Sequence, residues 1–220
     1  MDKHILYLGL DPSHYKRDRP LIHYPIIKIV PRSLSDSAIH VPLKNFDDYS
    51  HIIITSKSTA AILRDYLPKM GINLESWRKK TTLAVGKVTA SHLQAFGIHP
   101  SKIEEEETAE GMIAQIAKSS LAGAHLFWPH SAKARPIIEH FFLSHGIGYT
   151  SCILYDTIIQ QPGPLPDLKK IDEIIFTSPS TVDAFLHLFG TFPPHIQLTS
   201  IGPITAQHLN THLRHQACVR

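Results

Sequence analysis

The sequence contains the same pair of short motifs twice, about half its length apart. The segment IIITSKSTAAIL at 52–63 resembles IIFTSPSTVDAF at 174–185; each is an apolar run, a Thr-Ser-x-Ser-Thr motif and an apolar helix face. A second pair, AVGKVTASHL at 84–93 and SIGPITAQHL at 200–209, follows in the same order and shares Gly-x-x-Thr-Ala-x-His-Leu. Because two markers recur in one order, they indicate an internal duplication. The fold must therefore contain two related halves.

Apolar runs alternate with helical patterns around these markers. In the middle of the chain, predicted strands at 51–55, 81–85, 125–128 and 149–155 alternate with predicted helices, including one over 109–118 that Thr108 can cap. Towards the two ends, predicted strands at 5–9, 26–30, 173–177 and 197–201 accompany a helix after Ser178 and another over 203–214. Strands that alternate with helices of about ten residues require crossover connections, which produce parallel sheets covered on both faces.

The two ends of the chain are predicted to form one domain. Neither end holds enough strands and helices to close a core alone, whereas together they do. We therefore predict an α/β fold of two parallel-sheet domains, one inserted in the other. The inserted domain is placed at 34–158 and the discontinuous domain at 1–33 plus 159–220, with the Pro/Gly-rich stretch at 162–166 interpreted as a linker.

The composition is that of an ordinary globular protein, with 43% hydrophobic and 19% charged residues. The net charge of +3 suits an anionic ligand, but the basic residues are scattered, so we expect no nucleic-acid partner. The two cysteines, Cys152 and Cys218, make neither a disulfide framework nor a metal-binding Cys-x-x-Cys pair. The N-terminal run ILYLGL is too short for a signal sequence or a membrane span, so the sequence predicts a cytoplasmic protein without a membrane partner.

Histidine is abundant, with sixteen residues, and His208, His212 and His215 share one face of the predicted C-terminal helix. No His-Glu-x-x-His motif or comparable spacing accompanies them. Solvated histidines near a helix C-terminus, where positive charge is favourable, explain the pattern without an ion. We therefore expect no metal in the functional site.

The repeated motifs stand where a strand gives way to a helix. The hydroxyls of Thr55-Ser56 and Thr177-Ser178 can cap the first turn of the helix that follows. Gly86 and Gly202 open the second marker of each half and let a ligand approach the backbone closely. The leading N–H groups of a helix have no internal partner and attract anions. Four such junctions predict a cleft for a polyanion.

The two halves differ in charge, because Lys57 and Lys87 stand where Pro179 and Pro203 stand in the other copy. Ordinary helix capping would explain a single junction of this kind, but four of them favour an anion-binding site. The sequence contains no G-x-G-x-x-G motif, Walker P-loop or nucleophile elbow. It therefore supports binding of an acidic ligand more firmly than it supports any reaction.

Taken in order, six segments resemble the uroporphyrinogen-III synthase family. They are TSKSTAAIL, AVGKVTASHLQAFGI, TAEGMIAQI, GIGYTSCILYDT, FTSPSTVDAF and SIGPITAQHL, and they extend from about residue 50 to 213. The resemblance implies two α/β domains, one inserted in the other and joined by a two-strand linker. It also implies a cofactor-independent lyase of haem biosynthesis acting on hydroxymethylbilane, a linear tetrapyrrole with eight carboxylates. Such an enzyme expels the terminal hydroxyl as water, inverts the last pyrrole ring and closes the type III macrocycle.

The resemblance also implies roles for particular residues. Tyr155, in the LYDT segment, would donate a proton or a hydrogen bond to the departing hydroxyl, or would anchor the hinge as a structural residue. One wall of the substrate site would comprise Thr55, Ser56, Lys57, Gly86, Lys87 and Thr89, with Ser131 and Lys133 of WPHSAKAR as further contacts. The other wall would comprise Ser178, Pro179, Ser180, Gly202, Pro203 and Thr205. Backbone N–H groups would bind most of the substrate's carboxylates.

The N-terminal segment departs from the family, in which a helix usually follows the first strand, often after a Thr-Arg pair. Here LGLDPSHYKRDRPLIHYP has neither, and Lys16, Arg17 and Arg19 would either restore positive charge or stay solvated. This departure leaves open a second alternative, a non-catalytic anion-binding or sensor module of the same fold. A third, a nucleotide-binding regulatory domain, is disfavoured because the sequence has no phosphate-binding loop. We expect a monomer whose candidate protein partner is the upstream bilane-forming enzyme.

Overall fold

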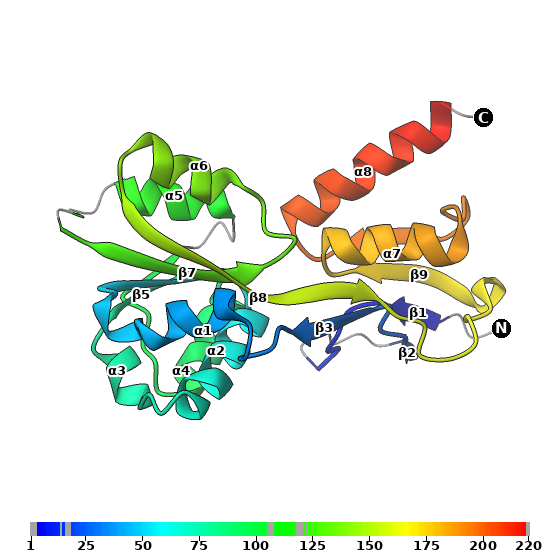
Figure 1. The fold of residues 1–220 in the computed structure, drawn as a ribbon. Coiled ribbons are helices and arrows are strands. Elements are labelled where there is room, and N and C mark those ends of the chain that lie inside the picture. The colour runs from blue at the N-terminus through cyan, green and yellow to red at the C-terminus, as the bar shows by residue number, and fades with distance from the viewer. Residues whose placement is uncertain are drawn as a thin grey trace. The chain divides into compact units, whose positions relative to one another are not determined.

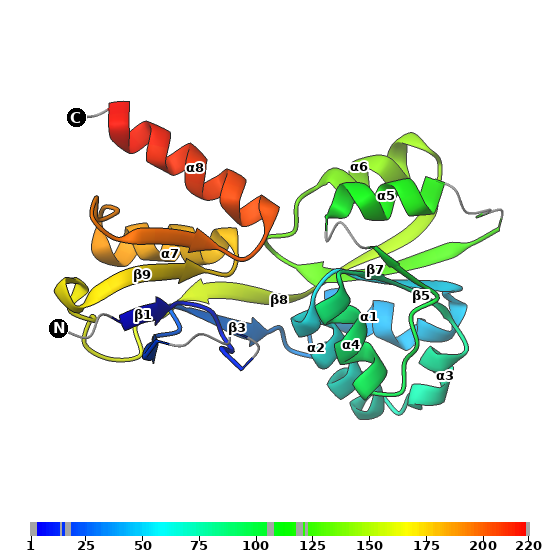
Figure 2. The same ribbon diagram turned by 180° about the vertical axis from the view of Figure 1, so that it is seen from behind.

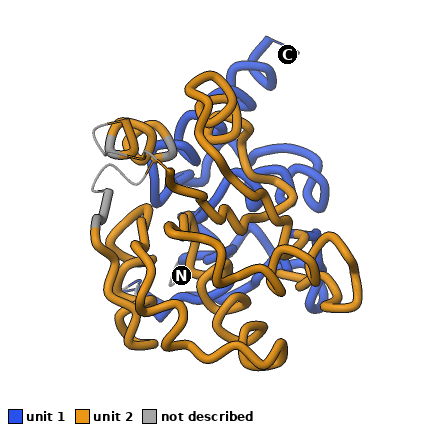
Figure 3. The backbone as a smooth tube through the Cα atoms, turned by 60° about the vertical axis from the view of Figure 1, so that its left-hand side comes forward, with its two compact units in different colours: residues 1–28, 157–220 blue, residues 29–156 orange. Residues whose placement is uncertain are grey.

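The computed structural model describes residues 4–13, 15, 19–104, 108–117, 121 and 123–218. The chain divides into two compact units, drawn in blue and orange in Figure 3. Unit 1 comprises residues 1–28 and 157–220, and unit 2 comprises residues 29–156. The sequence predicted the domain boundaries after residues 33 and 158, which is a few residues later than the observed boundaries after residues 28 and 156.

Unit 2 is built on a six-stranded sheet with the order β3-β8-β7-β4-β5-β6 (Figure 1). The strands are β3 (Ile27–Pro31), β4 (His51–Ile54), β5 (Thr81–Val85), β6 (Lys102–Glu104), β7 (His125–Ser131) and β8 (Gly148–Ile159), of which β3 and β8 continue into unit 1. The pairs from β8 through β6 are all parallel. The carboxyl ends of β4, β5 and β7 therefore lie at one edge of the sheet.

Helices cover both faces of this sheet (Figures 1 and 2). One face carries α1 (Ser37–Lys44), the 3-10 helix η1 (Phe46–Asp48), α2 (Lys57–Lys69), α3 (Leu74–Arg78) and α4 (Lys87–Ala95); the other carries α5 (Ala109–Ala117) and α6 (Ile137–Ser144). Successive strand residues point to opposite faces. Accordingly, Ile52 and Ile54 of β4 pack in one core with Leu63, while Ile53 packs in the other core with Phe142.

Unit 1 is built on a four-stranded parallel sheet with the order β10-β9-β1-β2. Its elements are β1 (His4–Tyr7), β2 (Leu21–His23), η2 (Leu168–Lys170), β9 (Ile171–Phe176), α7 (Pro179–Phe189), β10 (Gln197–Ser200) and α8 (Pro203–Cys218). Leu6 and Phe176 pack with Phe185 of α7 and Leu209 of α8 in the main core of the unit. Between β1 and β2 the described residues form no helix, as predicted. Within the described ranges, no helix has the length and apolar character needed to cross a bilayer.

The Pro/Gly-rich stretch at 162–166 does not connect the two units, contrary to the prediction. The chain leaves unit 1 within β3 and returns within β8. Hydrogen bonds from Arg32 N to Leu154 O (2.8 Å) and from Gln160 N to Ile26 O (2.9 Å) pair these two strands antiparallel. Gly163 belongs to unit 1, where its carbonyl accepts a hydrogen bond from the Tyr24 hydroxyl at 2.8 Å. The stretch is therefore a turn within unit 1.

Candidate functional site

Three of the predicted site segments lie at one edge of the unit 2 sheet. Ser56 follows β4, Gly86 follows β5 and Ser131 ends β7, and these neighbouring strands are parallel. Ser56 and Gly86 are the N-cap residues of α2 and α4, and Gly86 has φ 83°, a left-handed conformation that favours glycine. Because α6 begins only after Pro136, Ser131 caps no helix; its Oγ instead accepts a hydrogen bond from Lys133 N at 3.1 Å.

A hydrogen bond joins Ser56 to Tyr155, two predicted site residues that are far apart in the sequence. Ser56 Oγ lies 3.0 Å from the Tyr155 hydroxyl and accepts a hydrogen bond from Thr59 N at 3.1 Å. Tyr155 stands opposite Ser131 in the β7–β8 register, and its carbonyl accepts a hydrogen bond from Ala132 N at 3.0 Å. The Tyr155 side chain is only 5% exposed and packs in the α2-side core. The Tyr155 ring is therefore part of the core, and its hydroxyl contacts Ser56, the N-cap residue of α2.

Positive charge gathers along α2 and α4. Lys57 and Lys87 are the first residues of these helices; Lys57 is half-buried, while Lys87 and Lys133 are exposed. The pKa of His92, in α4, is lowered chiefly by burial and further by the positive charges of Lys57 and Arg64. Unit 2 therefore combines two helix N-termini with cationic side chains, which suits an acidic ligand.

Unit 1 repeats the arrangement at the carboxyl ends of β9 and β10, which are parallel neighbours. Ser178 precedes α7 and Pro179 is its first residue, while Gly202 and Pro203 occupy the same positions at α8. The Gly202 carbonyl accepts the first helical hydrogen bond, from Ala206 N at 3.0 Å. A Cβ added at Gly202 would meet no heavy atom within 4 Å. The backbone at the start of α8 is therefore open to a ligand.

A threonine occupies the third position of each of these four helices, and its side chain is buried. The four are Thr59, Thr89, Thr181 and Thr205, with exposed fractions of 0, 5, 0 and 4%. If Thr89 and Thr205 line the substrate site as the sequence predicts, they would contact the substrate through the backbone, because their side chains are buried. At this position the side chain lies on the core side of the first turn, so it is the residues before it that remain at the surface.

The hydrogen bonds of Thr181 indicate what this threonine does. Its Oγ1 accepts hydrogen bonds from the backbone N–H groups of Thr177 (3.1 Å) and Ser178 (3.2 Å) and donates one to Ser178 O (2.7 Å). Likewise, Thr59 Oγ1 lies 2.9 Å from Ser56 Oγ. The sequence reasoning assigned Thr59 and Thr181 no role, although each stands three residues after its serine, the spacing of a capping box.

Other predicted positions in unit 1 differ from their unit 2 counterparts. Ser178 Oγ is buried and belongs to a capping box with Thr181, whereas Ser56 Oγ also contacts the Tyr155 hydroxyl. Thr55 and Ser180, at the first and fourth positions of their motifs, are both half-buried. The two copies of the motif therefore share a backbone geometry more closely than a set of side-chain contacts.

The predicted basic residues of the N-terminal segment supply no unpaired charge where the structure describes them. The Arg19 guanidinium contacts Asp172 Oδ2 at 2.6 Å and Glu173 Oε2 at 2.5 Å. Because Glu173 is almost wholly buried, with a side chain 1% exposed, Arg19 serves to neutralise a core carboxylate. Lys16 and Arg17 lie outside the described residues.

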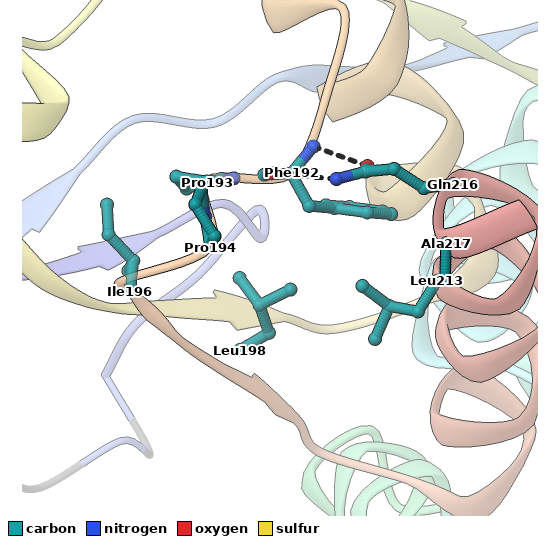
Figure 4. A pocket seen from close by; sticks show the side chains of 8 residues that line it. All are labelled: Phe192, Pro193, Pro194, Ile196, Leu198, Leu213, Gln216 and Ala217. Atoms are coloured by element: carbon teal, nitrogen blue, oxygen red, sulfur yellow. Dashed lines mark hydrogen bonds between the residues drawn. The ribbon is translucent and has the colours of Figure 1, made fainter. Parts of the chain in front are cut away.

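A pocket of about 390 Å³ in unit 1 is distinct from these helix N-termini (Figure 4). It is lined by Phe192, Pro193, Pro194, Ile196, Leu198, Leu213, Gln216 and Ala217. These residues come from the loop between α7 and β10, from β10 itself and from the end of α8, so the pocket lies at the opposite edge of the sheet from Ser178 and Gly202. The lining contains no charged side chain, and the Gln216 amide is engaged by the Phe192 backbone at 2.9 and 3.0 Å. The pocket therefore does not suit a polycarboxylate.

The architecture is found in solved structures of known function. A uroporphyrinogen III synthase from the extremely thermophilic bacterium Thermus thermophilus aligns with a TM-score of 0.66 and 14% identity, covering 95% of this chain and 88% of the other. Uroporphyrinogen-III synthetase from Helicobacter pylori 26695 aligns with a TM-score of 0.61 and 18% identity, covering 96% and 89%. At these identities the likeness establishes a shared fold, in agreement with the α/β fold predicted from the sequence.

Sequence comparison establishes the family. "Porphyrin biosynthesis protein HemD" of Ruminiclostridium josui is 26% identical over 192 residues, which are 84% of this chain but only 38% of that protein's length. The sequence pattern of the family described as "Uroporphyrinogen-III synthase HemD" matches residues 16–219, nearly the whole chain. The N-terminal departure noted above therefore does not remove the chain from the family that its motifs resemble. The chain belongs to the uroporphyrinogen-III synthase family of porphyrin-biosynthesis enzymes.

Proposed function

We propose that this protein is a cofactor-independent lyase that converts hydroxymethylbilane into uroporphyrinogen III. The C–O bond to the terminal hydroxyl breaks and the oxygen takes up a proton and leaves as water. The methylene carbon so freed bonds to the substituted α-carbon of the last pyrrole and forms a spiro intermediate. The original bond from that α-carbon to the chain then breaks and re-forms at the free α-carbon of the same ring, which loses a proton, so that the macrocycle closes with the last pyrrole inverted. The observation that carries the proposal is the set of four strand-to-helix junctions, at Ser56, Gly86, Ser178 and Gly202, that precede α2, α4, α7 and α8.

These junctions suit the substrate because its eight carboxylates need donors rather than an apolar pocket. Each helix N-terminus offers N–H groups without internal partners and a positive dipole end. In unit 2, Lys57 and Lys87 add full charges at the first position of each helix. Holding a flexible chain in one conformation lowers the entropic barrier to ring closure. Control of substrate shape is therefore the main contribution that we assign to the protein.

The Ser56–Tyr155 pair is our candidate for assisting loss of water. Tyr155 is too buried for its ring to lie alongside the substrate, but its hydroxyl is 3.0 Å from Ser56 Oγ at the start of α2. A hydrogen bond from Tyr155 to Ser56 would orient the serine hydroxyl as a donor to the leaving oxygen. In this proposal Ser56 contacts the substrate and Tyr155 is a positioning residue.

The direct test of the function is the isomer of the product. Freshly generated hydroxymethylbilane closes by itself to the type I macrocycle, so the enzyme is expected to divert it to the type III isomer. Chromatography of the oxidised products measures the ratio. A mixture containing only type I product, the same as in buffer alone, would exclude the synthase and leave a non-catalytic anion-binding module.

Replacing Tyr155 by Phe tests the assisting pair. Tyr155→Phe should lower the rate of type III formation by about tenfold or more, because the Ser56 hydroxyl loses the hydrogen bond that orients it towards the leaving oxygen. It should lower the free energy of unfolding by only about 1 kcal/mol, the net value of one hydrogen bond. Rates at saturating and at low substrate, together with urea unfolding, measure both effects.

Tyr66 provides the matched control for this substitution. Its side chain is 8% exposed in the same core, and its hydroxyl donates a hydrogen bond to the Arg32 carbonyl. Tyr66→Phe should cost similar stability and leave the rate unchanged. If the two variants had equal rates, Tyr155 would have no role beyond packing.

Replacing Gly202 by Ser tests the backbone site in unit 1. A Cβ there meets nothing within 4 Å, and serine is a good N-cap, so the fold should tolerate it. If a carboxylate binds the α8 N–H groups, the added side chain should lower kcat/KM by about tenfold, the cost of one hydrogen bond to a charged group. Gly163→Ser, equally open and in the same unit, is the control and should leave kcat/KM unchanged. Equal activity of the two variants would count against a ligand at α8.

A further inference from the structure

We propose that unit 1 binds a zinc ion between α7 and α8 through Asp183, His208 and His212. Asp183 lies on α7, while His208 and His212 are one turn apart on α8. Their ligand atoms all lie within 4.8 Å of one another. The site is separate from the strand-to-helix junctions, and the inference does not rest on the proposed function.

The distances fit zinc after small side-chain movements. Asp183 Oδ1 lies 2.7 Å from His208 Nε2 and 3.6 Å from His212 Nε2. Ligand atoms around tetrahedral zinc lie about 3.3 Å apart, given bond lengths of about 2.0 to 2.2 Å. The three side chains are 33 to 43% exposed, so an ion can enter and a water molecule can complete the coordination. Two imidazoles and a carboxylate are ligands that zinc accepts and that magnesium rarely uses.

The internal duplication indicates that the fold does not require this cluster. In the aligned motifs, Asp183 and His208 correspond to Ala61 and His92 of unit 2, and continuing the second alignment places Phe96 opposite His212. There His92 packs edge-on against Phe96, with ring centroids 4.7 Å apart. The equivalent helices α2 and α4 therefore pack together without a carboxylate or a second imidazole. Unit 1 has both at facing positions.

The alternative to a metal site is a contact that only stabilises the fold, in which His208 donates a hydrogen bond to Asp183 across the two helices. In that arrangement His212 packs edge-on against His208, with ring centroids 4.7 Å apart, as Phe96 packs against His92. Ring packing alone gives no role to the His212 Nε2, which lies 3.6 Å from the same Asp183 oxygen. The sequence pattern alone grouped His208 and His212 with His215. In the structure, the third member of the cluster is not His215 but Asp183, an acidic residue of α7. The candidate ligands are therefore two imidazoles and a carboxylate.

Titration of untagged, chelator-treated protein with ZnCl2 tests the site by calorimetry. Wild type is expected to bind one equivalent at this site and to unfold at a higher temperature with zinc than with magnesium, because an ion that binds the folded state stabilises it. His212→Gln removes one ligand but keeps the His208–Asp183 hydrogen bond, so the fold should persist. It should raise the dissociation constant for zinc at this site by about tenfold or more, since losing a ligand should cost at least as much as losing an outer-shell partner.

His92→Gln is the matched control, since it removes the histidine at the equivalent position of unit 2. It should leave the isotherm and the zinc-dependent shift in unfolding temperature as in wild type. Asp183→Asn should weaken binding as His212→Gln does. The proposal is overturned if wild type binds no equivalent of zinc, or if His212→Gln and His92→Gln give the same isotherm as wild type.

Discussion

A helix that follows a strand in a parallel sheet begins with N–H groups that its own hydrogen bonds leave unsatisfied. In this protein four such helices, α2, α4, α7 and α8, start directly after a serine or glycine and carry a buried threonine at the third position. The threonine stabilises the junction from the core side, as the hydrogen bonds of Thr181 illustrate. The first residue of each helix stays half-buried or exposed. Preformed donors of this kind bind carboxylates without reorganisation, and the proposed chemistry depends on that property.

The two halves of the duplication have diverged around this common element. Unit 2 has lysines at the first helical positions and a serine that contacts Tyr155. Unit 1 has prolines at the same positions and a serine whose buried hydroxyl belongs to a capping box with Thr181. Because proline fixes the backbone but offers neither charge nor an N–H group, unit 1 depends more on geometry and unit 2 more on charge. We therefore assign assistance with water loss to unit 2 alone.

Elements with strong local signals were predictable from the sequence. The β-branched run of β4 and the Thr-Ser-x-Ser-Thr motif predicted the strand, the cap and the helix that follows. Gly97, a residue type that commonly ends helices, follows α4 with a positive φ of 74°. Short elements were missed: α1 spans eight residues that include Pro42, and β2 and β6 span three residues each. Segments of that length carry too few periodic positions to differ from loops.

Contacts between distant segments could not be predicted from sequence patterns. The Ser56–Tyr155 hydrogen bond joins residues 99 positions apart, and the Asp183–His208 hydrogen bond joins residues 25 apart on two helices. Spacing also did not reveal that the Thr89 and Thr205 side chains are buried, because the motif fixes their position along the helix but not which way the side chain packs. Burial, which is a property of the assembled sheet and helices, decided their role.

The central claim is that backbone amides at the four helix starts bind the acid groups of the tetrapyrrole. Amide chemical shifts of ¹⁵N-labelled protein, titrated with the octacarboxylate product, test it directly. The largest shifts are expected at residues 56–59 and 86–89 in unit 2, and at 178, 180, 181, 202, 204 and 205 in unit 1, where Pro179 and Pro203 have no amide N–H. Shifts confined to other segments, such as the apolar pocket around Phe192 and Leu213, would contradict it.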